Sequence, residues 1–106
     1  MIEHRVRRPL KRPPSHPGEL MREILVEHLR MPLAEAARRM GVTRTGLYAV
    51  LGGKHGLTAE MALRYGKLIG APVEAYLSMQ TNYDLWRAEQ KLAASLKKIE
   101  TVKRAA

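Results

Sequence analysis

The chain has 106 residues, with nineteen Lys and Arg against ten Asp and Glu, and it contains no cysteine. This length fits one small domain with a single core. The lack of cysteine excludes a disulfide framework and a thiolate metal site, and it fits an intracellular setting. No apolar run approaches the roughly 18 residues needed to span a membrane, and no signal-peptide pattern opens the chain, so we expect a soluble, cytoplasmic protein without a membrane partner.

Positive charge gathers at the two ends of the chain. Residues 1–16 carry five Lys and Arg against one Glu, and residues 87–106 carry six against two, whereas residues 17–86 carry eight against seven acidic residues. Basic ends suit a polyanion such as DNA, because Lys and Arg displace counterions from phosphates. The alternative is that these ends only keep the protein in solution, and charge alone does not decide between the two.

Residues 1–15 are predicted to form a disordered basic arm. Pro9, Pro13 and Pro14 alternate with Arg and Lys, and the segment offers little apolar surface for burial. Such an arm either reaches a DNA minor groove or phosphates, or is simply an unstructured leader.

A first helix is predicted to begin at Ser15 or His16, with Pro17 in its first turn. Proline suits this place because the first helical N–H has no partner within the helix. The expected buried face has apolar residues at helical spacing, namely Leu20, Met21, Ile24, Leu25 and Leu29.

Residues 32–54 are predicted to form two short helices joined by a tight turn. The apolar positions are Leu33, Ala36, Ala37 and Met40 in the first of them, and Leu47, Val50 and Leu51 in the second. Gly41 suits the positive φ that ends a helix, Thr43 is a good N-cap, and the small side chain of Ala37 allows the two helices to cross closely. This order favours a helix-turn-helix over an ordinary helical hairpin, and its second helix is the one that enters a DNA major groove.

The outward face of this recognition helix predicts the DNA contacts. If the apolar positions face the core, helical geometry turns Arg44, Thr45, Tyr48 and Ala49 outward. Arginine pairs bidentately with guanine or binds a phosphate, and threonine contacts a base or a thymine methyl group. The predicted DNA-binding residues are Thr43, which also caps the helix, Arg44, Thr45, Tyr48 and Lys54, with Arg38 and Arg39 as weaker phosphate candidates. The alternative for each is a solvated surface side chain.

Glycines within and after the recognition helix need an explanation. Gly46 lies inside the helix, where glycine costs roughly 1 kcal/mol relative to alanine. It either permits close approach to the DNA backbone or accompanies modest specificity. The glycine-rich run 52–56 is not a nucleotide-binding loop, because Tyr48 stands where the first glycine is required and no Ser or Thr follows Lys54.

Two further helices are predicted after this run. Thr58 caps a fourth helix that Gly70 ends, with Ala62, Leu63, Leu68 and Ile69 as core candidates. Pro72 starts a fifth helix whose aromatic content is high for a helix that only covers a small domain, although core packing can absorb part of it. The predicted dimer contacts on it are Tyr76, Leu77, Tyr83 and Trp86. A two-fold dimer presents two recognition helices about one DNA turn apart, ~34 Å.

No catalytic residue, metal site or cofactor is predicted. The four histidines are scattered, no HExxH pattern occurs, and no nucleophile stands in a recognisable motif with a base. The aligned glutamates at 19, 23 and 27 lack a second acidic motif, so a solvated helix face explains them. These patterns argue against an enzyme.

Four segments resemble the HigA family of antitoxins, also called VapI, within the XRE/Cro-type helix-turn-helix group. They are HPGELMRE at 16–23, the helix-turn-helix at 33–53, GLTAEMALRYGKLIG at 56–70 and VEAYLSMQTNYDLWRAE at 73–89, and the similarity covers roughly residues 13–90. The resemblance implies an all-α, five-helix, lambda-repressor-like fold with an extended C-terminal helix. The predicted division is an arm at 1–15, a DNA-binding and dimerisation domain at 16–90, and a basic helical tail at 91–106.

The same resemblance implies a type II antitoxin that forms homodimers, binds a HigB-like mRNA endonuclease toxin of RelE-type fold, and represses its own operon at double-stranded operator DNA. It assigns DNA contacts to Thr43, Arg44, Thr45 and Tyr48, and dimer contacts to residues 73–89. Pro32-Leu33 replaces a common Ser-Gln pair, and Gly46 and Tyr48 replace more usual polar residues, so the operator sequence and affinity do not follow. The alternative function is a solitary XRE-family regulator without a toxin.

Overall fold

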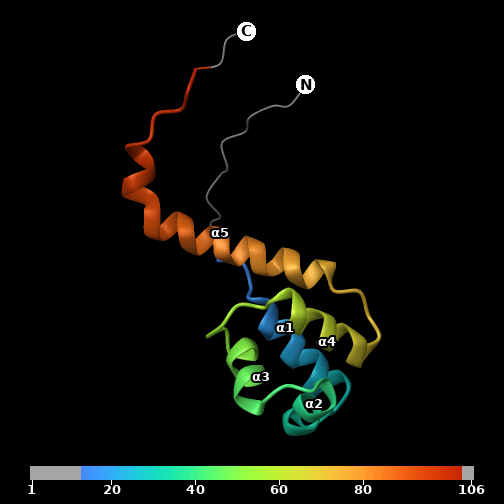
Figure 1. Ribbon diagram of the computed structural model, residues 1–106. Coiled ribbons are helices and arrows are strands. Elements are labelled where there is room, and N and C mark those ends of the chain that lie inside the picture. The colour runs from blue at the N-terminus through green and yellow to red at the C-terminus, as the bar shows by residue number, and fades with distance from the viewer. Residues whose placement is uncertain (1–12, 104–106) are drawn as a thin grey trace.

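The computed structural model describes residues 13–103, and all regular secondary structure in this part of the chain is helical, with no strand (Figure 1). The elements are α1 (Pro17–Glu23), the π-helical turn η1 (Ile24–His28), α2 (Leu33–Met40), α3 (Arg44–Leu51), α4 (Ala59–Ile69) and α5 (Glu74–Lys97). The expected all-α fold with five helices is therefore confirmed. Within residues 13–103, no helix is long and apolar enough to cross a membrane.

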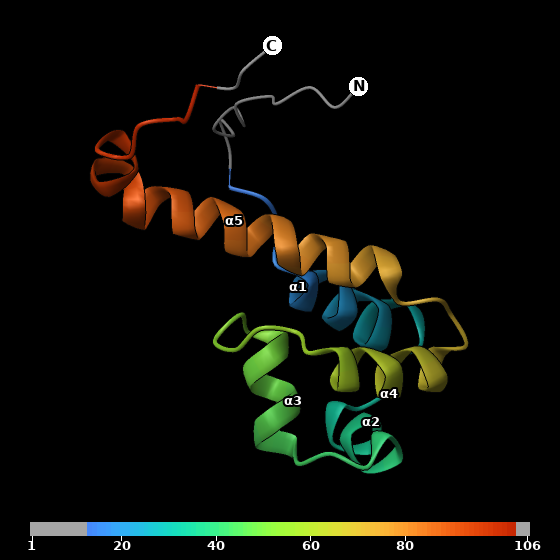
Figure 2. The same cartoon turned by 45° about the horizontal axis from the view of Figure 1, so that its top comes forward.

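Helix α5 lies across one side of the body, and α2 and α3 lie on the far side from it (Figures 1 and 2). It runs unbroken through residue 90 to Lys97, and residues 98–103 are not helical. The described part of the predicted helical tail, residues 91–103, is thus helical only as far as Lys97. Residues 1–12, most of the predicted arm, and residues 104–106 lie outside the described range, so the division into arm, domain and tail stays a prediction.

One apolar cluster holds the helices together. It consists of Met21, Leu25, Ala36, Ala37, Met40, Leu47, Val50, Leu51, Leu57, Ala62, Tyr65 and Tyr76. The apolar positions predicted for the helix-turn-helix are all buried except Leu33, which is partly buried against the same cluster. Because Ala36 and Ala37 lack bulk, α2 packs closely into this core and fixes the position of α3.

Two residues that were expected in the core are exposed. Leu29 is 47% exposed because η1 widens the helix: the N–H of Leu29 donates to the carbonyl of Ile24, five residues back, at 2.9 Å. This π turn shifts the helical face, and Met31 is partly buried instead. Leu63 is 66% exposed because Ala62 and Tyr65 of α4 face the core.

Tyr76 pairs with Tyr65 inside the core. The two rings lie 5.1 Å apart in an edge-to-face arrangement, and the hydroxyl of Tyr65 donates to that of Tyr76 at 3.4 Å. Burial, reinforced by Tyr76, raises the pKa of Tyr65 above its ordinary value. Tyr76 is therefore buried in the core of its own chain and has little area left for a contact between two copies, and its role as a dimer contact stays a prediction.

Candidate nucleic-acid interface

The turn between α2 and α3 has the geometry of a helix-turn-helix. Gly41 ends α2 in the left-handed conformation with φ of 73°, and the N–H of Val42 donates to the carbonyl of Ala37 at 3.0 Å. Thr43 then caps α3, because its Oγ1 accepts a 3.0 Å hydrogen bond from the N–H of Gly46. Both predicted caps are confirmed, so the start of α3 is rigidly oriented.

Gly46 is the residue whose N–H the Thr43 cap receives. A Cβ added to this residue would lie 3.0 Å from Thr43 Oγ1, so a larger residue requires a small shift of the capping side chain. Capping boxes place Glu or Gln at this position of a helix, so the cap alone does not require glycine. The two explanations that the sequence left open for Gly46 therefore stay open.

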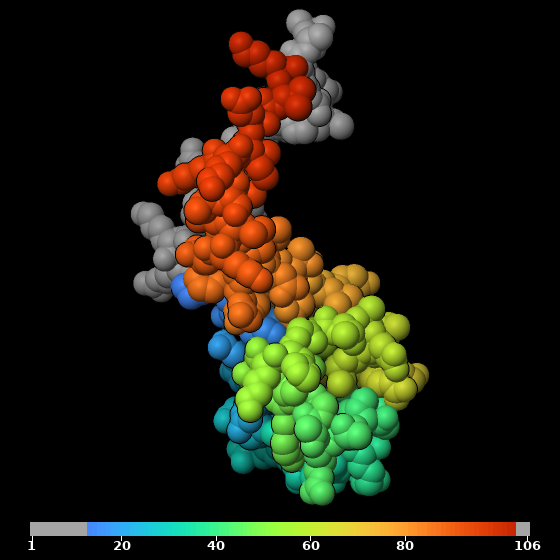
Figure 3. Space-filling view, turned by 60° about the vertical axis from the view of Figure 1, so that its left-hand side comes forward, coloured from blue at the N-terminus to red at the C-terminus, as the bar shows by residue number. Residues whose placement is uncertain are grey.

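The outward residues of α3 lie where the sequence placed them. Leu47, Val50 and Leu51 face the core, and the opposite face of the helix is exposed. The exposed residues include all five predicted DNA-binding residues, Thr43, Arg44, Thr45, Tyr48 and Lys54. In Figure 3 the start of α3, drawn in green, lies at the lower end of the molecule, and the loop after α3 rises toward α5. The structure thus presents these five residues on one accessible region, and their DNA contacts stay a prediction.

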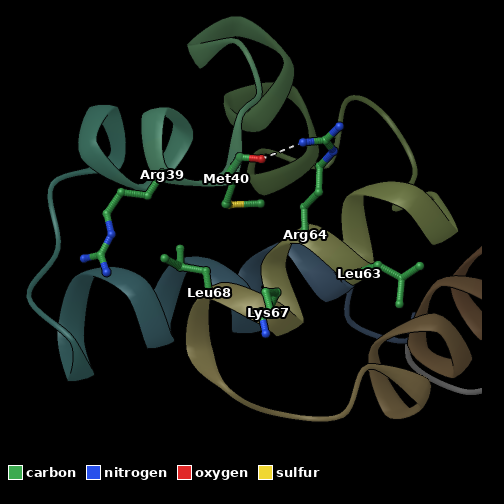
Figure 4. Close-up of a pocket in the computed structure, with 6 residues that line it drawn as sticks. All are labelled: Arg39, Met40, Leu63, Arg64, Lys67 and Leu68. Atoms are coloured by element: carbon green, nitrogen blue, oxygen red, sulfur yellow. Dashed lines mark hydrogen bonds between the residues drawn. The ribbon is translucent and has the colours of Figure 1, made fainter.

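Arg38 and Arg39 point to different flanks of α2, since consecutive residues of an α-helix differ by about 100°. Arg38 lines a hollow of about 560 Å³ between α2 and α3, together with Val42 and Arg44. Arg39 lines a different hollow of about 510 Å³ between α2 and α4, together with Arg64 and Lys67 (Figure 4). Of the two weaker phosphate candidates, only Arg38 therefore lies beside the recognition helix.

The cations of the predicted interface, Arg44 and Lys54, form no ion pair with a carboxylate of the described residues. Arg39 and Arg64 instead form long, exposed pairs with Glu35 and Glu60, at 3.5 and 3.4 Å. Since no ion pair with another residue of the range 13–103 has to break first, Arg44 and Lys54 can receive an anionic partner. In the same range of residues, no three His, Asp or Glu side chains lie close enough together to hold a metal ion.

His16 is a structural residue that the sequence only partly indicated. It is the N-cap of α1, because its Nδ1 accepts a 2.9 Å hydrogen bond from the N–H of Gly18. It is only 5% exposed, and its ring meets the edge of Tyr83 at 5.0 Å. Tyr83 therefore turns toward the start of α1 in its own chain. The centroids of the Tyr83 and Trp86 rings lie 6.5 Å apart. Leu77, Tyr83 and Trp86 are partly buried, and their role as dimer contacts stays a prediction.

Two further polar residues, Arg64 and Gln80, were missed by the sequence analysis. Arg64 donates to the carbonyl of Met40 at the end of α2, and Gln80 accepts from the N–H of Leu57 in the loop after α3. Both contacts join residues more than twenty positions apart. The single available signal was a glutamine amid the apolar and aromatic residues of the fifth helix.

Comparison with known proteins gives no match to a family model. Virulence-associated protein I of Dichelobacter nodosus is 33% identical over 78 residues, which cover 74% of this chain and 72% of the relative. The HTH-type transcriptional regulator YbaQ of Escherichia coli K12 is 32% identical over 93 residues, which cover 86% of this chain and 82% of the regulator.

Solved structures share most of this fold. An addiction module antidote protein of the HigA family from Coxiella burnetii superposes with a TM-score of 0.75 and 31% identity, over 85% of this chain and 98% of that protein. The chain belongs to the HigA/VapI family of XRE-type helix-turn-helix antitoxins. Another member of this fold, Pseudomonas aeruginosa antitoxin HigA with the higBA promoter, has a TM-score of 0.77 over 85% of this chain and 99% of its own. At 24% identity, that likeness concerns the fold alone.

Proposed function

We propose that this protein is a sequence-specific DNA-binding repressor that acts as the antitoxin of a type II toxin–antitoxin module. The observation that carries the DNA-binding part is the capped, rigid helix α3, which exposes Arg44, Thr45 and Tyr48 while its opposite face is buried. A helix fixed on one face and exposed on the other fits the width of a B-DNA major groove.

In this proposal, α3 enters the major groove and reads base edges. Arg44 pairs with a guanine, and Thr45 and Tyr48 contact neighbouring bases or a thymine methyl group. Thr43 and the free N–H groups at the start of α3 receive a phosphate. Lys54 and Arg38 contact phosphates on either side of the groove, which adds affinity that is independent of sequence.

The repressor acts as a homodimer through α5. Leu77, Tyr83 and Trp86 are the proposed contacts, because they keep exposed apolar and aromatic area after packing on their own chain. Tyr76 is left out of this set, since it is buried against Tyr65. A two-fold dimer doubles the DNA contacts of one recognition helix and matches a near-palindromic operator.

The antitoxin part of the proposal rests on family membership. The protein is proposed to bind a HigB-like mRNA endonuclease of RelE-type fold, to block its action, and to repress their common operon. A second function, that of a solitary regulator without a toxin, is favoured by the similarity to YbaQ, which is described only as a transcriptional regulator.

A gel shift on the protein's own promoter DNA tests the DNA-binding part. We expect Arg44→Ala with Thr45→Ala to abolish specific retention, whereas Lys91→Ala on exposed α5, which also removes one positive charge, retains it. Full binding by the double variant contradicts the assignment of α3.

Co-expression tests the antitoxin part. If the adjacent reading frame encodes a growth-inhibiting toxin, the protein should restore growth and copurify with its product. The absence of any such neighbour, together with failure to rescue cells from candidate toxins, leaves the solitary regulator.

A further inference from the structure

The loop between α3 and α4, residues 52–58, carries Lys54 and is attached to the body at both ends. At its first end, the N–H groups of Lys54 and His55 both donate to the carbonyl of Ala49 in α3, at 2.9 and 3.1 Å. Gly53, with φ of 75°, lies against the ring of His16, where an added Cβ would come within 3.8 Å of His16 Cγ. This part of the loop is therefore fixed to α3 and to the start of α1.

At its second end the loop is held by one side chain of α5. Gln80 Oε1 accepts a 2.7 Å hydrogen bond from the N–H of Leu57, and both residues are buried. Gly56 lies so close to this amide that an added Cβ would be 3.2 Å from Gln80 Nε2. Gln80 thus forms a polar link between α5 and the loop that follows the recognition helix.

Asp84 fixes the orientation of the Gln80 amide. Gln80 Nε2 donates a 2.9 Å hydrogen bond to Asp84 Oδ1, one helical turn further along α5. A carboxylate only accepts hydrogen bonds, so the amide nitrogen must face Asp84 and the amide oxygen must face Leu57. The Gln80 amide is therefore held in one orientation, with its oxygen toward the N–H of Leu57, and does not flip by 180°.

Between these two attachments, Lys54 and His55 are exposed. We propose that Gln80 is a positioning residue for DNA binding: by holding Leu57, it fixes the loop so that the Lys54 ammonium group meets the DNA backbone beside α3. Replacing the amide by an apolar side chain leaves the N–H of Leu57 buried without a partner, so the loop moves to satisfy it. This inference rests on the proposed contact between Lys54 and a phosphate.

The test measures the affinity for the protein's own promoter DNA by fluorescence anisotropy over a range of salt concentrations. We expect Lys54→Ala to weaken binding several-fold and to reduce the slope of log K against log salt by about 0.9 per lost phosphate contact. Gln80→Leu should give the same reduction of the slope, and adding it to Lys54→Ala should cause little further loss. Combined with Arg44→Ala, which removes a separate contact, its effect should instead be additive.

A charge-conserving exchange separates positioning from simple destabilisation. In Gln80→Glu with Asp84→Asn, a carboxylate oxygen still accepts from Leu57 and the new amide at position 84 donates back, so the slope should return to that of the unaltered protein. Gly56→Ala crowds the amide without altering it and replaces Gln80→Leu if that variant does not fold, which circular dichroism and thermal melting establish.

The outcomes distinguish the two proposals. An unchanged affinity and slope in Lys54→Ala overturns the Lys54 contact, and with it both the corresponding part of the proposed function and the positioning role. A normal loss in Lys54→Ala with no change in folded Gln80→Leu overturns the role of Gln80 alone. If Gln80→Leu lowers the DNA affinity equally in the unaltered protein and in Lys54→Ala, Gln80 does not act through Lys54, and the positioning role is overturned.

Discussion

The guanidinium group of Arg64 in α4 donates a 2.8 Å hydrogen bond from Nη1 to the carbonyl oxygen of Met40, the last residue of α2 (Figure 4). The last carbonyls of a helix have no partner within it, and they carry the negative end of the helix dipole. A cation from α4 therefore completes the first helix of the helix-turn-helix. Gly41 leaves room for this contact, since an added Cβ would lie 2.9 Å from Nη1.

We predict that Arg64→Met lowers the free energy of unfolding by about 1–2 kcal/mol, because it removes a charged hydrogen bond but keeps most of the aliphatic stem. Urea denaturation measures this change. The matched control is Lys67→Met on the same helix, where an exposed cation without a hydrogen-bond or ion-pair partner among residues 13–103 is lost and a change within about 0.5 kcal/mol is expected. Equal stability of the two variants means that the cap contributes nothing.

Thr43 combines a structural role with a predicted phosphate contact, and three substitutions separate them. Thr43→Ala removes the hydrogen bond to Gly46, so it should cost about 1 kcal/mol of stability and weaken DNA binding. Thr43→Ser should retain both properties. Thr43→Asp should cap α3 equally well but repel a phosphate, so its melting temperature should be preserved while its operator affinity falls at least tenfold. If folded Thr43→Asp binds the operator as strongly as the unaltered protein, the predicted phosphate contact at Thr43 is wrong.

The helix-turn-helix could be predicted from sequence because its determinants are local. Apolar spacing, a glycine at position 41 and a capping threonine at position 43 each act within a few residues of chain, and all three lie as predicted. The same locality placed Arg44 and Tyr48 on the outward face. Once the buried side of α3 was known, the helical period alone was sufficient to predict which residues of the candidate site are exposed.

Other features could not be predicted because they depend on distant partners. The π turn at η1, which exposes Leu29, arises because the N–H of Leu29 bonds to the carbonyl five residues back. No residue type in this segment predicts that change. In the sequence, Tyr76 is one of several aromatic residues of the fifth helix. Its burial depends on Tyr65, eleven positions earlier in the chain, which packs against it only in the folded structure. Which of Arg38 and Arg39 lies beside α3 and which beside α4 likewise depends on how these helices pack on α2.

The proposed dimer contact predicts a change of assembly on substitution of α5. Trp86→Lys places a charge at a partly buried aromatic position, so sedimentation should shift from dimer to monomer, and operator affinity should fall more than tenfold because the second recognition helix is lost. Leu96→Lys, at an exposed position of the same helix beyond residue 89, is the control that should remain dimeric. Dissociation by Leu96→Lys but not by Trp86→Lys moves the contact to the end of α5.

The buried pair of Tyr65 and Tyr76 predicts a loss of stability at alkaline pH. Burial raises the pKa of Tyr65 above the ordinary value of 10.0, so above about pH 10 the phenol ionises in the unfolded chain while it stays protonated in the folded one. The unfolded state then binds fewer protons, and this group's contribution, fully present below pH 10, declines by up to about 1.4 kcal/mol per pH unit. Tyr65→Phe lacks this ionisation but also lacks the hydrogen bond to Tyr76, which costs about 1 kcal/mol at neutral pH. Urea denaturation of both proteins between pH 7 and pH 11 should therefore show two curves that converge above pH 10, with the common titration of lysines cancelling in the difference. Curves that stay parallel over this range contradict the prediction.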